Sequence, residues 1–293
     1  MTAVPFSYDE MVGRNIGFVT EAEQRRLKGA HVVVCGVGGM GGAAVACLVR
    51  TGIGHFTIAD IDTFELSNLN RQMFANLDTV GLSKAATTKD AILRINPECS
   101  VEVLGAEWTE RLDTLVNADV IINGCDDVKA TLALLRAAAG RVPVIDAFAA
   151  TLPSVYVIKP DDPRPEELFG YPSRGRAIAS LSADDVSACV TKELAWVMAH
   201  SSTRKHVVME VAMEFAAGKR KRFSFAPMVW MTGCLMAYEA IRLILGKPGG
   251  PGVGGAFVNP WELQVEQPPP APLAKAKQWA MEKALAVMQR MNK

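Results

Sequence analysis

Short apolar runs alternate with helix-period stretches over the first half of the chain. An apolar run at 32–35 passes into a glycine-rich turn and then into a small-residue stretch at 43–49, and a second apolar run at 55–59 ends at Asp60. Four to five apolar residues bounded by turn residues indicate a buried strand, and small residues without breakers indicate a closely packed helix. The order predicted here is therefore strand, turn, helix, strand.

The same alternation continues toward residue 158. Helices are predicted at 20–29, 83–95 and 128–139, and strands at 100–104, 120–123, 142–147 and 155–158. Thr20 with Glu23 three residues later is the pattern of a capping box at a helix start. Strands that alternate with helices predict an α/β fold, in which a mostly parallel sheet is covered by helices on both faces.

The pattern changes after residue 158. Residues 160–172 hold four prolines and predict an irregular connection, and residues 183–217 are mainly helical with a break near Ser201. A long apolar helix is predicted at 228–245, followed by a hairpin of strands at 256–258 and 262–265. A proline-rich linker at 268–272 then leads into a basic helix over the last 21 residues.

Composition narrows the class of protein. Lysine plus arginine and aspartate plus glutamate both number 31, and this balance argues against a general nucleic-acid binder. The N-terminus lacks the pattern of a signal peptide, and the uncharged stretch 31–49 contains five glycines, so we read it as a buried strand and helix rather than a membrane span. We expect a cytoplasmic protein with no membrane partner. The six cysteines form no C-x-x-C pair, and we expect reduced, mostly buried thiols.

The glycine turn between the first two strands has the spacing of a nucleotide-binding loop. Gly36 permits the tight turn, Gly38 and Gly39 let the backbone approach a phosphate, and Gly41 lets the helix pack on the sheet. Backbone N–H groups at the start of that helix would point at the anion. Asp60, at the end of the second strand, lies where a carboxylate accepts both ribose hydroxyls. A glycine-rich contact without a ligand is the alternative interpretation, which the complete strand–helix–acid order disfavours.

Polar and cationic residues just past the second strand indicate which type of nucleotide would bind. They are Asn68, Arg71, Gln72 and Lys84. Arginine grips phosphate oxygens in a two-pronged fork and lysine acts as a point charge, so both suit a triphosphate better than a nicotinamide. The alternative for Arg71 and Lys84 is solvated surface charge.

Taken in order, these motifs resemble those of the ThiF/MoeB/HesA superfamily, the bacterial relatives of ubiquitin-activating enzymes. The resemblance rests on Arg14-Asn15, the glycine turn, 60–62, 67–72, Gly81-x-x-Lys84, Asn96-Pro97 and Asp126. It implies a doubly wound, Rossmann-like sheet extended by antiparallel strands, in a homodimer. It also implies attack of a carboxylate on the α-phosphate of ATP, with Mg²⁺, to give an acyl-adenylate and pyrophosphate.

The resemblance assigns roles residue by residue. Asp126 would hold Mg²⁺ and Asp60 the ribose, Arg71 and Lys84 would bind the triphosphate, and Arg14 would reach the partner subunit's triphosphate. Asp62 either caps the following turn or assists at the metal. Asp127 stands where many relatives carry asparagine, which alters the surroundings of the metal or base.

Other parts of the chain depart from the better-known relatives. Without C-x-x-C pairs we expect no zinc site. Cys189 is the only cysteine in the crossover region, and it is either a thioester-forming nucleophile or a buried helix residue. The basic cluster 219–222 either meets an acidic partner or is a solvated helix end.

We divide the chain into five expected segments. These are an N-terminal helical arm that contacts the dimer partner (1–29), an ATP-binding core (30–159), a mostly helical, substrate-facing crossover insertion (160–225), a helix and hairpin that complete the core (226–267), and a proline linker with a basic helix (268–293).

The function expected from the resemblance is that of an ATP-dependent adenylyltransferase. Its substrate would be the C-terminal carboxylate of a ubiquitin-like or sulfur-carrier protein, a peptide or a small acid. Two alternatives remain open: an NAD- or FAD-binding oxidoreductase, and a catalytically silent relative that binds a nucleotide or a partner. A dehydratase branch that activates a carboxylate on modified tRNA also matches the first half, although no charged nucleic-acid surface is evident.

Overall fold

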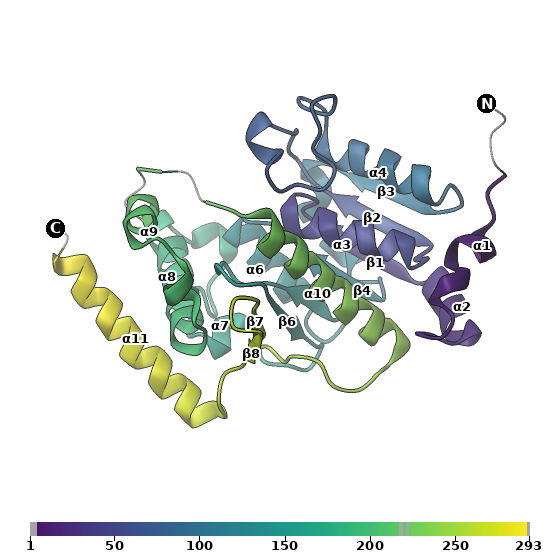
Figure 1. Cartoon of the computed structure of the whole chain (residues 1–293). Coiled ribbons are helices and arrows are strands. Elements are labelled where there is room, and N and C mark those ends of the chain that lie inside the picture. The colour runs from purple at the N-terminus through teal and green to yellow at the C-terminus, as the bar shows by residue number, and fades with distance from the viewer. Residues whose placement is uncertain (1–4, 217–218, 221–222, 292–293) are drawn as a thin grey trace.

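The computed structural model describes residues 5–216, 219–220 and 223–291, so Lys221 and Arg222 of the basic cluster lie outside the described residues. Within these ranges the chain forms an eight-stranded mixed sheet with helices on both faces (Figure 1). The strands are β1 (His31–Cys35), β2 (His55–Ala59), β3 (Ser100–Leu104), β4 (Val120–Asn123), β5 (Val144–Asp146), β6 (Ser154–Ile158), β7 (Ala256–Asn259) and β8 (Gln264–Glu266). The α-helices are α1 (Tyr8–Val12), α2 (Glu21–Gly29), α3 (Gly39–Arg50), α4 (Lys84–Ile95), α5 (Leu112–Leu115), α6 (Val128–Ala137), α7 (Pro165–Leu168), α8 (Ala183–His200), α9 (Met209–Ala216), α10 (Ala226–Leu245) and α11 (Ala271–Met291).

The strand order β3-β2-β1-β4-β5-β6-β7-β8 confirms the predicted fold class. Strands β1 to β5 pair in parallel, and β6, β7 and β8 extend the sheet by antiparallel pairing. The order reverses between β1 and its neighbour β4, and such a switch point is where open α/β sheets bind ligands, beyond the carboxyl ends of the strands.

Both faces of β1 are buried, which explains its uninterrupted apolar sequence. Val32 and Val34 pack into a core layer with α3 and α10, whereas Val33 and Cys35 pack into a layer with α6 and α8. All four side chains have an exposed fraction of 0%. Continuous burial of this kind is characteristic of a central parallel strand.

The predicted N-terminal boundary of α2 is confirmed in detail. Thr20 accepts a hydrogen bond from the N–H of Glu23, and the Glu23 carboxylate accepts one from the N–H of Thr20. The break after His200, the hairpin and the left-handed Gly246 that ends α10 also agree with the sequence. The prediction of an irregular segment at 160–172 was incomplete, because it contains the short α7. Pro165 occupies the first turn of α7, where a missing N–H costs no helical hydrogen bond.

Helix α10 is long and apolar enough to cross a bilayer, with a mean hydropathy of 1.4. In the fold it lies along α3 and over the sheet (Figure 1), and Met236, Ala237 and Ala240 of its inner face are buried. The apolar composition of α10 is therefore explained by its packing against the protein core.

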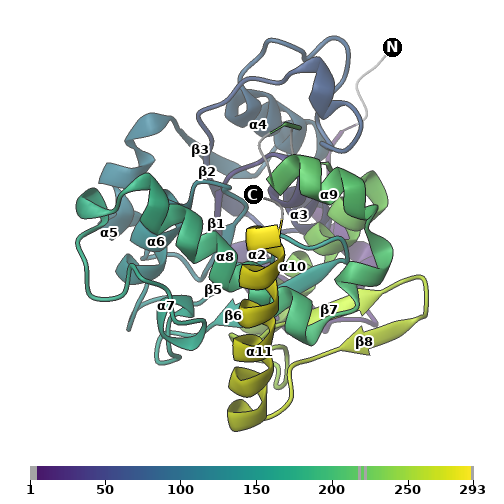
Figure 2. The ribbon, with the colours of Figure 1, turned by 90° about the vertical axis from the view of Figure 1, so that its left-hand side faces the viewer.

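Helix α11 lies across α8 (Figure 2). Lys192 of α8 forms an ion pair with Glu282 of α11 at 2.7 Å, and Gln278 Nε2 donates to the carbonyl of Phe169. The C-terminal helix is thereby attached to the insertion rather than to the β1–β4 region.

Candidate nucleotide site

The glycine turn packs so closely against the β4 loop that side chains are excluded. Gly36 has a φ of +87°, and a Cβ there would lie 2.5 Å from the carbonyl carbon of Gly124. A Cβ on Gly41 would lie 1.9 Å from the Gly36 oxygen, and one on Gly39 would lie 2.7 Å from a methyl group of Val229. The expected reasons for Gly36 and Gly41 are confirmed, since the first requires a left-handed turn and the second close packing.

Asp60 is attached directly to this turn. Its Oδ2 accepts a hydrogen bond from the Val37 N–H at 2.8 Å, and its Oδ1 accepts one from the Asp62 N–H at 2.9 Å. Burial raises the pKa of the Asp60 carboxyl, while these two N–H groups and Lys84 act in the opposite direction. The carboxylate therefore lies at the carboxyl end of β2, beside the N-terminus of α3.

The Gln72 side chain lies next to Gly38 of the glycine turn. A Cβ on Gly38 would lie 3.5 Å from Gln72 Nε2, and the Oε1 atom of Gln72 is buried without a hydrogen-bond partner in the described structure. A buried polar atom without a partner costs free energy, so a ligand that donates to Oε1 would remove that cost. The turn, Asp60 and Gln72 together fit a nucleotide.

Lys84 comes from the first turn of α4 and faces Asp62. Its Nζ lies 2.8 Å from Asp62 Oδ2, and the Lys84 side chain is 10% exposed against 62% for Asp62. Of the two roles left open for Asp62, capping of the following turn is not observed. The residue that precedes the 3-10 helix Leu66–Asn68 is Glu65, and the Glu65 N–H donates to Asn68 Oδ1. Asp62 instead holds the lysine.

Arg71 is held in a loop by several contacts. Its Nη1 donates to the Ser67 carbonyl at 3.0 Å and to Asn70 Oδ1 at 2.8 Å, and its own carbonyl accepts from Trp230 Nε1 of α10. Asn68, which is 6% exposed, uses its Oδ1 inside this loop. Arg71 is therefore positioned by the loop and by α10.

Asp126 lies in the loop after β4, three residues beyond the strand end at Asn123, and is exposed. The neighbouring Asp127 caps α6 by accepting from the Ala130 N–H at 2.7 Å. Cys125 lies among the carboxylates of Asp60, Asp126 and Asp127. Its thiol pKa is raised to about 11, mainly by burial and further by these three negative charges. No group of three metal-binding side chains occurs in the described residues. One carboxylate completed by phosphate oxygens and water is nevertheless the arrangement that Mg²⁺ favours, so Asp126 fits the ion in the presence of ATP.

Arg14 is not near this site within one chain. Its neighbour Asn15 donates to the Thr51 carbonyl at the C-terminal end of α3, and the glycine turn is at the opposite end of that helix. Twelve helical residues span about 18 Å. Arg14 is exposed there, so the glycine turn of its own subunit is out of reach.

Cys189 is a buried residue of helix α8. Its exposed fraction is 1%, and it belongs to the same core layer as Trp196 and Leu181. A buried thiol does not meet a protein partner in this conformation, which favours the second of the two expected roles, that of a buried helix residue.

Two buried residues near the site were missed by sequence reasoning. They are Asp146, which ends β5 and is 6% exposed, and Asn123, which ends β4. The Asn123 Nδ2 group donates a hydrogen bond to Asp146 Oδ2 at 2.9 Å. Burial raises the pKa of Asp146 to about 7, and Glu193 contributes in the same direction. An acid that ends an apolar run was the signal that identified Asp60, and the same signal identifies Asp146.

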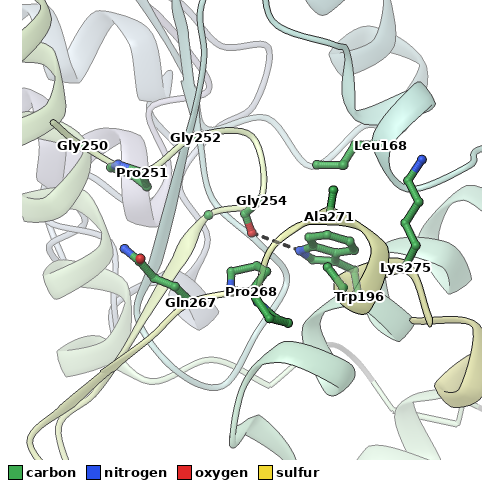
Figure 3. Close-up of a pocket in the computed structure, with 13 residues that line it drawn as sticks. Leu168, Trp196, Gly250, Pro251, Gly252, Gly254, Gln267, Pro268, Ala271 and Lys275 are labelled. Atoms are coloured by element: carbon green, nitrogen blue, oxygen red, sulfur yellow. Dashed lines mark hydrogen bonds between the residues drawn. The ribbon is translucent and has the colours of Figure 1, made fainter. Parts of the chain in front are cut away.

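A pocket of about 290 Å³ lies elsewhere, between the glycine-rich loop 249–255 and the start of α11 (Figure 3). Trp196 lines it and donates from Nε1 to the Gly254 carbonyl at 3.0 Å. None of the residues assigned to the nucleotide lines it.

A doubly wound sheet with a glycine turn and a strand-end carboxylate at its switch point is the architecture of α/β nucleotide-binding proteins. The family model described as "ThiF family" matches residues 12–279, and the chain belongs to that family.

Individual relatives agree with this assignment. The molybdopterin-synthase adenylyltransferase of Haemophilus influenzae is 27% identical over 232 residues, which are 76% of this chain and 79% of that protein. The tRNA threonylcarbamoyladenosine dehydratase of the same organism is 33% identical over 132 residues, 44% of this chain and 51% of that protein. Across three such relatives, the matched region covers between 28% and 79% of the relative's own length.

Solved structures share the fold. Escherichia coli MccB with ATP aligns with a TM-score of 0.62 at 18% identity, over 92% of this chain and 76% of that one. MccB with MccA gives the same TM-score at 20% identity, over 90% and 73%.

Proposed function

We propose that the protein is an ATP-dependent adenylyltransferase that activates a carboxylate as an acyl-adenylate. The observation that carries the proposal is the attachment of Asp60 to the phosphate turn through the Val37 N–H, with the Lys84–Asp62 pair and Asp126 around the same carboxyl edge of the sheet. An adenylyltransferase among its relatives, and the shared fold of an MccB structure with ATP, support the same activity.

In this mechanism the N-terminus of α3 receives the phosphates and Asp60 receives the ribose hydroxyls. A carboxylate oxygen of the substrate attacks the α-phosphorus, the bond to the bridging oxygen of the β-phosphate breaks, and pyrophosphate leaves. Negative charge develops on the phosphate oxygens, which Lys84 and Arg71 stabilise from fixed positions. Mg²⁺ held by Asp126 would supply further neutralisation of that charge.

The substrate class is the second part of the proposal. We propose the C-terminal carboxylate of a small ubiquitin-like or sulfur-carrier protein, or of a peptide. The support is indirect: one relative is named for molybdopterin synthase, and one structure of the same fold is of MccB with MccA. A cytoplasmic location belongs to this proposal and agrees with six free cysteines.

A homodimer with composite sites is the third part. Arg14 is exposed at the end of α3 farthest from its own phosphate turn, and Ile16 and Phe18 beside it are 44% and 88% exposed. Apolar side chains at such exposure favour a protein contact. A two-fold partner seated there would receive Arg14 in its own triphosphate site.

ATP–pyrophosphate exchange with a panel of carboxylate substrates tests the activity. The expected result is exchange that depends on one class of carboxylate and is lost in Asp126→Ala, while the unfolding midpoint stays close to wild type. Calorimetry with ATP and with NAD⁺ is the companion measurement. Tight NAD⁺ binding without ATP binding would assign an oxidoreductase, and ATP binding without exchange for any acid would assign a silent relative.

A further inference from the structure

Two cysteines from distant parts of the chain meet on the seam between α3 and α10. Cys47 Sγ and Cys234 Sγ are 3.6 Å apart although the residues are separated by 187 positions in sequence. Both side chains are half-buried, so small solutes can reach the seam.

The close approach follows from how the two helices cross. Gly233, next to Cys234, faces α3 with no room for a side chain: a Cβ there would lie 2.5 Å from the Ala43 Cβ and 2.6 Å from the Met40 carbonyl oxygen. Cys47 is one turn beyond Ala43 on the same face of α3. The tight crossing at Gly233 therefore sets the two sulfurs against each other.

The remaining cysteines lack this arrangement. Cys35, Cys99 and Cys189 are buried, and Cys125 is half-buried among carboxylates. Cys47 and Cys234 are the cysteines for which the described residues show a sulfur–sulfur contact.

We propose that Cys47 and Cys234 are a reversible dithiol–disulfide site, oxidised by exchange with a low-molecular-weight disulfide and closing a covalent link between the phosphate-binding helix and α10. One thiolate attacks a sulfur of the small disulfide, forms a mixed disulfide and releases one small thiolate. The second cysteine, as thiolate, attacks the mixed disulfide at the protein sulfur, forms the Cys47–Cys234 bond and releases the second small thiolate. The two protons from the protein thiols go to the released thiolates, so the protein is oxidised by two electrons and the small disulfide is reduced.

The geometry requires little rearrangement. A disulfide bond is about 2.05 Å long, so the sulfurs must approach by roughly 1.5 Å, which side-chain rotation can supply. The link closes a long loop across the chain, and links of this kind restrict the unfolded ensemble most. Cys47 lies eight residues into α3 from Gly39, about 12 Å along the helix from the phosphate turn, so the link tightens the helix pair without entering the nucleotide site.

The chemistry also predicts how the rate depends on pH. Burial, with a hydrogen bond to Cys234, raises the pKa of Cys47 to about 11. The thiolate is the attacking form, so the rate of cross-linking should rise with pH between neutrality and pH 9.

The experiment uses the full chain treated with oxidised glutathione at pH 8, trapped with acid and alkylating agent, and mapped by mass spectrometry without reduction. The expected product has lost two thiols and about 2 Da, contains a linked Cys47–Cys234 peptide, and returns to the starting mass with dithiothreitol. Its urea midpoint is higher than that of the reduced protein. Cys125→Ser, the matched control with another half-buried thiol removed, keeps the cross-link.

Cys234→Ser should abolish both the cross-link and the rise in the urea midpoint, and Cys47→Ala provides the same test if Cys234→Ser does not fold. Glutathione adducts without a link, a disulfide between two chains, or no loss of thiols over a day would each overturn the proposal. The readouts involve no nucleotide, so they are independent of the adenylyltransferase activity.

Discussion

Lys84 Nζ lies 2.8 Å from Asp62 Oδ2, and this contact joins the first turn of α4 to the segment that follows β2. The lysine is buried and the aspartate is exposed, so the cation is held at a fixed position while one side of the pair stays open to solvent. The Lys84 N–H also donates to the Asp62 carbonyl at 3.0 Å. A cation fixed before the substrate arrives needs no reorganisation when charge develops on a phosphate.

Lys84→Ala should lower the rate of ATP–pyrophosphate exchange by about 10²-fold, because removal of one pre-positioned charge donor typically has that effect. Lys89→Ala, on the same helix, is the control and should leave exchange unchanged. Equal losses in the two variants would mean that helix α4 as a whole, rather than the Lys84 charge, is responsible.

Arg14→Ala and Arg71→Ala should each be inactive alone and should regain activity when mixed. In a mixed dimer one composite site combines the intact Arg14 of one subunit with the intact Arg71 of the other. With random exchange of subunits, roughly a quarter of the wild-type sites are restored. Exchange assays before and after co-refolding measure this, and sedimentation that shows an active monomer would contradict it.

Gly124→Ala should destabilise the protein by more than about 2 kcal/mol, because the new Cβ overpacks the junction between the glycine turn and the β4 loop. That Cβ would lie 2.4 Å from the Gly36 carbonyl oxygen, and backbone cannot move aside as a flexible side chain can. Gly13→Ala is the matched control: its φ is −55° and nothing lies within 4 Å of the added carbon. Its unfolding free energy in urea should change by less than about 0.5 kcal/mol.

Asp146 should make stability fall as pH rises from about 4 to about 7. Burial raises its folded-state pKa to about 7, so in this window the folded protein binds a proton that the unfolded chain has released. The contribution of the protonated Asp146 to the free energy of unfolding is complete at pH values below the unfolded-state pKa near 4. It is lost as the pH rises through the folded-state pKa. A tenfold difference in proton affinity between the folded and unfolded states corresponds to about 1.4 kcal/mol, so the upper limit here is about 4 kcal/mol.

Asp146→Asn keeps an oxygen for the Asn123 amide but cannot ionise. The variant should therefore gain stability over wild type at pH 8 and show little difference near pH 4.5. Urea denaturation at both values measures the change, and a parallel offset at the two pH values would count against a buried titrating carboxyl.

Patterning along the chain was sufficient for most of the helices and strands and for the position of the glycine turn and Asp60. Uninterrupted apolar runs identified the parallel strands because both faces of β1 are buried. The glycine spacing and Asp60 could be predicted because their physical requirements are local: a left-handed turn at Gly36 and a carboxylate at a strand end. The match over 12–279 and the mixed sheet confirm the family and fold that these motifs indicated.

Contacts between distant segments were decided only by the tertiary structure. No local pattern shows that Cys47 meets Cys234 or that Arg14 lies at the far end of α3. Such features depend on which helix crosses which, and therefore on side-chain volume at single positions such as Gly233. Sequence periodicity determines which face of a helix is apolar, but the packing of the whole chain determines what that face meets.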